Sequence, residues 1–189
     1  MERKGVMSNK VWNLPNVLTM IRLLLIPVTI LLILDNQMVF ALIVFLTACG
    51  TDLLDGYIAR KNHLITKLGI WLDPLADKLM AVSVIVTFTI RGILPPFVMI
   101  VVFAKEFLML LGGVIILGRG HVTPANKFGK IAALLLNISI GSGFLYEYLS
   151  PYYLYATYVA LAAVIVAFVQ YAAKNGHLIF EKKPSAREE

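Results

Sequence analysis

Apolar residues occur in blocks of about 20 along most of this chain, and that length limits the folds open to it. A helix of about 20 residues crosses a hydrocarbon core ~30 Å thick. Of the 189 residues, 59% are hydrophobic and 15% are charged, whereas a soluble domain has about 25% charged residues. We therefore expect an all-α integral membrane protein. Short loops leave no room for a second domain, so one domain is expected over residues 1–189.

The apolar blocks predict six transmembrane helices. Their expected ranges are 14–34, 38–60, 67–90, 97–117, 131–148 and 151–173. A basic interfacial segment, residues 1–13, precedes them, and a polar tail, residues 174–189, follows. The third range is the least apolar, because Asp73, Asp77 and Lys78 lie in its first half. We expect this half to line an aqueous pocket, where polar residues at membrane depth are tolerated.

Lysine and arginine are distributed unevenly between the segments that connect these helices. One set of segments, which includes both termini and the loops at 61–67 and 118–130, holds 13 of them, and the opposite set holds only Arg91. The positive-inside rule therefore predicts cytoplasmic termini and loops. In this setting the net charge of +6 indicates contact with anionic lipid head groups, so no nucleic-acid partner is expected.

Four aspartates lie at the predicted cytoplasmic ends of the second and third helices. Asp52 and Asp55 are spaced i, i+3, and Asp73 and Asp77 are spaced i, i+4, so each pair lies on one helix face. Two antiparallel helices joined by a short loop can point these faces at each other. Converging carboxylates repel one another unless a cation neutralises them.

The residue types around the aspartates indicate the cation and the ligand. Oxygen ligands, with no Cys or His pair nearby, favour Mg²⁺, Mn²⁺ or Ca²⁺ over Zn²⁺. Two divalent ions ~4 Å apart would polarise a diphosphate and its leaving group. The small residues Gly56, Ala59 and Gly69 let a ligand approach the backbone, and Arg60 offers a charge for phosphate. The acids alone also allow an ion site or a proton pathway in a membrane transporter.

Two other polar features have two interpretations each. Asn16, Thr19 and Arg22 form a stripe on one face of the first helix. Arg22 either extends to the membrane interface or faces a polar cavity shared with the aspartates. Lys105 beside Glu106 in mid-span is either a structural ion pair or a functional site.

The aspartates belong to a longer pattern with eight fixed positions. It reads Asp-x2-Asp-Gly-x2-Ala-Arg-x8-Gly-x3-Asp-x3-Asp and comprises Asp52, Asp55, Gly56, Ala59, Arg60, Gly69, Asp73 and Asp77. The chain resembles the CDP-alcohol phosphotransferase family, whose signature is this pattern. The resemblance implies that an alcohol hydroxyl attacks the β-phosphorus of a CDP-linked donor and that CMP leaves. It also implies a homodimer in a bacterial-type cell (cytoplasmic) membrane.

The resemblance assigns roles to these positions. Asp52, Asp55, Asp73 and Asp77 would hold two divalent cations, Mg²⁺ or Mn²⁺, and Asp77 would also be the general base. The CDP site would be formed by Asp52, Asp55, Gly56, Ala59, Arg60 and Gly69.

Two further segments concern the acceptor alcohol. Residues 13–27 and 71–80 resemble those of bacterial phosphatidylglycerophosphate synthases, which transfer a phosphatidyl group from CDP-diacylglycerol to sn-glycerol 3-phosphate. This acceptor is a phosphate dianion and needs a cationic pocket. The candidates are Arg22, Lys78, Lys105, Lys127 and Lys130.

One departure keeps a second acceptor open. Such synthases typically carry Arg-Glu-Phe and, six residues later, another Arg, where this chain has Lys105-Glu106-Phe107 and Gly113. The alternative is a cardiolipin synthase of the CDP-alcohol type, which uses phosphatidylglycerol as acceptor.

Overall fold

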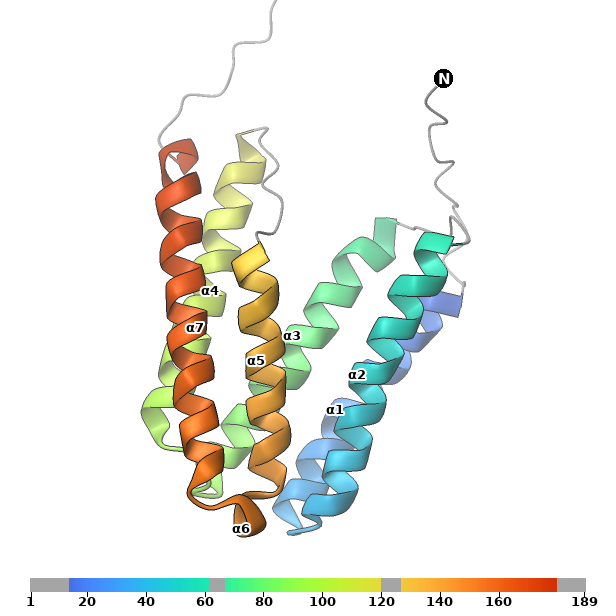
Figure 1. The fold of residues 1–189 in the computed structure, drawn as a ribbon. Helices are drawn as coiled ribbons and strands as arrows, with labels where there is room; N and C mark the ends of the chain where they lie inside the picture. Colours follow the sequence, from blue (N-terminus) through green and yellow to red (C-terminus); the bar gives the residue numbers. More distant parts are fainter. Residues whose placement is uncertain (1–13, 62–66, 120–126, 180–189) are drawn as a thin grey trace, which may run out of the picture. The chain divides into compact units, whose positions relative to one another are not determined.

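The computed structural model describes residues 14–61, 67–119 and 127–179, with side chains for residues 16–51, 72–119 and 128–178. Within these ranges the chain is helical apart from short turns and contains no strand (Figure 1). The helices are α1 (Leu14–Leu34), α2 (Met38–Lys61), α3 (Lys67–Ile90), α4 (Pro96–Gly118), α5 (Lys127–Phe144), α6 (Tyr146–Leu149), α7 (Tyr152–Asn175) and the 3-10 helix η1 (Gly176–Ile179). They form two compact units, Met1–Ile93 and Leu94–Glu189.

Most helix boundaries agree with the predicted ranges to within two residues, but the fifth range was wrong at both ends. The helix begins at Lys127 and ends at Phe144. At Leu145 the backbone leaves the helical conformation (φ −103°, ψ 25°), and its N–H donates to the carbonyl of Ser142, only three residues back. The residues that follow, Tyr146–Leu149, form the separate helix α6. Near the C-terminus, helical structure continues beyond the predicted end at residue 173, through α7 and η1, to Ile179.

Three stretches with described side chains are long and apolar enough to cross a membrane: Asn16–Leu34, Pro96–Gly118 and Tyr152–Leu178. Met38–Thr51 and Phe128–Phe144 are apolar but shorter. The helix α3 is not among them, because the part of it with described side chains, residues 72–90, carries three charged residues, Asp73, Asp77 and Lys78. Six membrane spans therefore remain a prediction.

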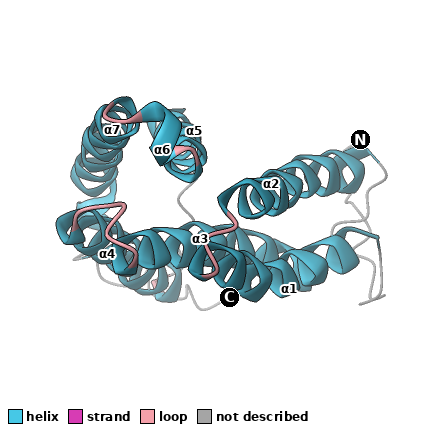
Figure 2. Cartoon of the chain, turned by 90° about the horizontal axis from the view of Figure 1, so that it is seen from below, coloured by secondary structure: helices cyan, strands magenta, loops and turns pink. Residues whose placement is uncertain are grey.

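In the first unit, α1 is the packing centre. It packs against both α2 and α3, whereas α2 and α3 contact each other little (Figure 2). Ile33, Ala41, Phe45, Val84 and Phe88 are buried among these helices. The helix α1 also buries four polar residues, Asn16, Thr19, Arg22 and Thr29.

The helices α1 and α3 run in the same direction and end in the same way. In α1 the N–H of Gln37 donates to the Leu32 carbonyl, and in α3 the N–H of Ile93 donates to the Phe88 carbonyl. Asn36 (φ 63°) and Gly92 (φ 71°) take up the left-handed conformation that this C-terminal motif requires. Both helices thus end in a Schellman motif.

The side chain of Arg91 joins these two helix ends. Its Nη2 donates to Oδ1 of Asn36 at 2.7 Å, and its Nη1 donates to the carbonyl of Leu34 at 3.3 Å. Because the last carbonyls of a helix lack intrahelical donors, the second bond also caps α1. We call this arrangement the Arg91 clasp. It fixes the C-terminal ends of α1 and α3 relative to each other.

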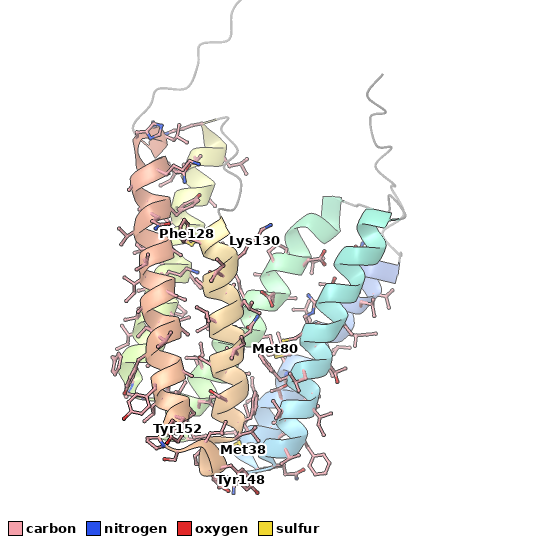
Figure 3. All side chains as sticks on the ribbon, in the orientation of Figure 1. Met38, Met80, Phe128, Lys130, Tyr148 and Tyr152 are labelled. Atoms are coloured by element: carbon pink, nitrogen blue, oxygen red, sulfur yellow. The ribbon has the colours of Figure 1, made fainter. Side chains whose placement is uncertain are left out.

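In the second unit, α7 packs along α5 and also contacts α4 and η1. Val98, Ile140, Phe144, Ala160 and Val164 form part of its buried interior. Figure 3 shows Lys130 near the start of α5, and Tyr148 and Tyr152 at the opposite end, by α6 and the start of α7. Lysine at one end and tyrosine at the other suit a bundle that spans a bilayer, with an aromatic belt at one interface.

Candidate active site

The four aspartates of the pattern lie in the second half of α2 and the first half of α3. Asp55 lies six residues before the end of α2 at Lys61, and Asp73 lies six residues after the start of α3 at Lys67. The chain reverses between these helices, so both positions are near the same end. The side chains of Asp52 and Asp55 lie outside the described residues, as do those of the predicted CDP-site residues Gly56, Ala59, Arg60 and Gly69. Their convergence with α3 stays a prediction.

Asp73 and Asp77 lie one turn apart on α3, and both side chains are half-buried. Oδ1 of Asp73 accepts a hydrogen bond from the hydroxyl of Thr19 on α1. This contact connects residues that are 54 positions apart in the sequence. It places α1 beside the second half of the aspartate pattern, as the interpretation of Arg22 as a residue of a polar cavity shared with the aspartates requires.

The polar stripe of α1 faces the interior of the unit. The exposed fractions of Asn16, Thr19 and Arg22 are 3%, 0% and 1%. Of the two interpretations of Arg22, extension to the membrane interface is therefore not observed. Within the described residues, its Nε and Nη1 atoms have no hydrogen-bond acceptor, although the guanidinium makes other interactions. A buried, permanently charged group thus lies one turn from the Thr19–Asp73 contact.

The other candidate cations are divided between the two units. Lys78 is half-buried and follows Asp77 on α3. Lys105 and Glu106 on α4 form an ion pair, with Nζ and Oε1 2.6 Å apart and exposed fractions of 20% and 16%. The pair expected under the structural interpretation is therefore present. Lys130 on α5 is exposed, and the side chain of Lys127 lies outside the described residues.

The described side chains contain part of a donor set for a hard divalent cation. The described side chains, which do not include those of Asp52 and Asp55, contain no group of three His, Cys, Asp or Glu residues able to hold a metal. Asp73 and Asp77 supply carboxylate oxygens of the kind that Mg²⁺ and Mn²⁺ prefer. Thr19 bonds only one of the two oxygens of Asp73, so the bond is compatible with metal coordination through the other.

Sequence reasoning placed Thr19 in the polar stripe but gave it no role at the site. The spacing with Arg22 showed that both residues share a face. It could not show that α3 covers this face.

Residues 12–169 match the family model described as CDP-alcohol phosphatidyltransferase. The match covers most of the chain, and the protein belongs to this family. Together with the three long apolar helices, the family indicates an integral membrane protein.

Three curated relatives are similar to this chain over most of its length. The CDP-diacylglycerol–glycerol-3-phosphate 3-phosphatidyltransferase of Bacillus subtilis is 32% identical over 87% of this chain and 95% of its own length. The protein of the same name from Aquifex aeolicus is 28% identical over 90% of this chain and 99% of its own. A cardiolipin synthase (CMP-forming) from Streptomyces coelicolor is 35% identical over 74% of this chain and 72% of its own.

Proposed function

We propose that this protein transfers a phosphatidyl group from CDP-diacylglycerol to sn-glycerol 3-phosphate, forming phosphatidylglycerophosphate and releasing CMP. The observation that carries the proposal is the near full-length similarity to two relatives named for this reaction. The complete eight-residue pattern on α2 and α3 supports it. Family membership also favours an enzyme over the transporter that the acids alone allowed.

In the proposed mechanism, Asp52, Asp55, Asp73 and Asp77 hold two divalent cations, Mg²⁺ or Mn²⁺. Bound there, the cations would neutralise charge on the diphosphate and on the departing CMP. A carboxylate oxygen of Asp77 takes the proton from the acceptor hydroxyl. The hydroxyl oxygen then forms a bond to the β-phosphorus, and the bond from that phosphorus to the CMP oxygen breaks.

The CDP group of the donor would lie against the small residues of the pattern. Gly56, Ala59 and Gly69 have little or no side chain, so a nucleotide can approach the helix backbones. Arg60 supplies a guanidinium for phosphate, which it can bind through two parallel hydrogen bonds.

For the acceptor phosphate we propose the candidate cations Arg22, Lys78, Lys105, Lys127 and Lys130. The position of Arg22 supports its inclusion, because it lies on the same face of α1 as Thr19, which bonds Asp73. Lys105 already pairs with Glu106, so binding phosphate would require it to exchange or share that partner.

We further propose that both units form one catalytic domain in the cell membrane. The family model spans both units, which supports this. The termini and the aspartate end would face the cytoplasm, as the distribution of lysine and arginine indicates. Cysteine labelling at residues 35 and 62 in intact cells would test the orientation, since only residue 35 should react with an impermeant reagent. Mass measurement in lipid nanodiscs would test the homodimer that the family resemblance implies.

Measuring CMP release by the purified protein tests the reaction. CDP-diacylglycerol, Mg²⁺ or Mn²⁺, and one acceptor at a time are supplied, with a chelator as the control. We expect CMP and phosphatidylglycerophosphate with sn-glycerol 3-phosphate, and neither after chelation. Release of CMP with another alcohol but none with glycerol 3-phosphate would show that the proposed acceptor is wrong.

The second candidate function is cardiolipin synthesis with phosphatidylglycerol as acceptor. Two observations favour keeping it: the similarity to the Streptomyces coelicolor enzyme, and Gly113 where a second arginine is typical. A lipid acceptor needs less cationic charge than glycerol 3-phosphate. The same assay with phosphatidylglycerol distinguishes the two functions.

A further inference from the structure

The hydrogen bond of Thr19 differs from those of the other threonines whose hydroxyl bonds the structure describes. Five of them donate to the carbonyl four residues back in their own helix, and one donates three residues back: Thr29, Thr47, Thr87, Thr89, Thr157 and Thr51. Such local bonds are the usual choice of threonine in a helix. Thr19 donates to a carboxylate on another helix.

The position of Thr19 makes this difference relevant to the site. Its side chain is fully buried, and the α1–α3 contact fixes the direction from which it reaches Asp73. A hydroxyl that donates to one carboxylate oxygen restricts the rotation of the carboxylate and so orients the second oxygen. Groups of this kind, which hold a metal ligand without touching the metal, commonly change metal affinity 10–100-fold when they are removed.

The geometry points to Thr19 as a positioning residue for Asp73, one that orients this carboxylate toward a divalent cation. The inference rests on the proposed function, because it takes Asp73 as a metal ligand. The alternative role of the Thr19–Asp73 hydrogen bond is only to hold α1 and α3 together, as polar contacts between membrane helices do. The two roles differ in whether metal affinity depends on the hydroxyl.

Three substitutions separate these roles. Thr19→Val removes the hydroxyl and keeps the branched shape, and Thr19→Ser keeps the hydroxyl. Thr29→Val is the matched control, because Thr29 lies on the same helix, is equally buried and donates to the Leu25 carbonyl. Each full-length variant would be purified in nanodiscs without metal. Mn²⁺ alone would then be titrated, with free Mn²⁺ followed by electron paramagnetic resonance and thermal unfolding measured on the same samples.

We expect Thr19→Val to weaken Mn²⁺ binding about 10-fold or more, and we expect Thr19→Ser and Thr29→Val to bind as the native protein does. Unchanged Mn²⁺ affinity in Thr19→Val would overturn the inference, and so would the same loss in Thr29→Val. If Thr19→Val does not fold, Thr19→Ser tests the inference in its place, because it keeps the hydroxyl and should bind Mn²⁺ as the native protein does. A Thr19→Ser variant that folds normally but binds Mn²⁺ more weakly would contradict the positioning role.

The proposed function has its own separate readout. Native protein that binds Mn²⁺ but releases no CMP with any acceptor would overturn the function and leave the role of Thr19 in metal binding intact. Native protein that releases CMP while Thr19→Val binds Mn²⁺ normally would overturn only the role of Thr19.

Discussion

Arg91, just beyond the end of α3, donates a hydrogen bond of 2.7 Å to Asn36, just beyond the end of α1. Toward the other end of the same pair of helices, Thr19 donates to Asp73. The two contacts join residues separated by similar distances in the sequence, 55 and 54 positions. Two parallel helices held at both ends in one register cannot slide past each other, so the position of α1 relative to Asp73 is fixed.

Breaking the Arg91 clasp is expected to lower stability slightly and leave chemistry unchanged. Arg91→Ala removes the donor, and Asn36→Gly removes the acceptor while keeping a residue suited to positive φ. Each should cost about 0.5–1 kcal/mol, because the contact is exposed. Thermal unfolding of both single variants and the double variant measures this. Costs that add fully in the double variant would contradict a direct interaction.

We expect the largest loss of activity from substitution of the proposed general base, Asp77. Asp77→Asn keeps the size of the side chain but removes its basicity and weakens it as a metal ligand. We expect initial rates of CMP release to fall at least about 10²-fold, the lower end of what general bases contribute. Asp35→Asn, the same change in the turn after α1, is the control and should be as active as the native protein. Activity retained in Asp77→Asn would exclude the role of base.

The buried guanidinium of Arg22 is expected to bind the phosphate of the acceptor. Arg22→Lys keeps the charge but loses the planar donor fork, and Arg22→Met loses both. We expect KM for sn-glycerol 3-phosphate to rise about 10-fold in Arg22→Met and less in Arg22→Lys, because a charged hydrogen bond contributes about 1.5–3 kcal/mol. Initial rates at saturating CDP-diacylglycerol measure this. An unchanged KM in both variants would remove Arg22 from the acceptor site.

The ion pair between Lys105 and Glu106 allows structural and functional roles to be separated. Lys105→Met and Glu106→Leu should each lower the Tm, because each leaves the other half-buried charge without this partner, at a cost of about 2 kcal/mol. The double variant should regain most of the lost Tm. If Lys105 also binds the acceptor phosphate, the double variant keeps a raised KM for glycerol 3-phosphate, and this is the result we expect. A normal KM there would make the pair purely structural.

Gly113 offers a gain-of-function test of the acceptor. A Cβ added at Gly113 meets no described atom within 4 Å, so Gly113→Arg should be tolerated, and arginine favours a helix more than glycine does. It restores a guanidinium at the position where the related synthases typically have one. We expect KM for glycerol 3-phosphate to fall several-fold, with Gly112→Arg, the adjacent position with equal room, as the control. No difference between the two would show that position 113 does not contact the acceptor.

The sequence predicted the helices better than their packing. Apolar blocks interrupted by Asp35-Asn36-Gln37 and by Arg91-Gly92 located α1, α2 and α3 to within one residue. The end of α5 was predicted too late because residues 145–149 are all compatible with a helix, and the first helix-breaking residue after them is Pro151. Hydropathy does not register a single change of backbone conformation.

The site was predicted in part for a similar reason. Spacing alone placed each aspartate pair on one face and identified the polar stripe of α1. It could not identify which helix covers that stripe, because the partner depends on three-dimensional packing. The contact between Thr19 and Asp73, and the burial of Arg22, therefore emerged only from the structure.

The sequence separation of 54 positions between Thr19 and Asp73 also has a consequence for biogenesis. The ribosome completes α1 and α2 before Asp73 of α3 is made, so α1 enters the bilayer while Thr19 still lacks the carboxylate that later accepts its hydrogen bond. A polar face without its partner helix is costly in lipid. We therefore expect the nascent α1–α2 hairpin to be the intermediate that depends most on the insertion machinery, and the arrival of α3 to release it.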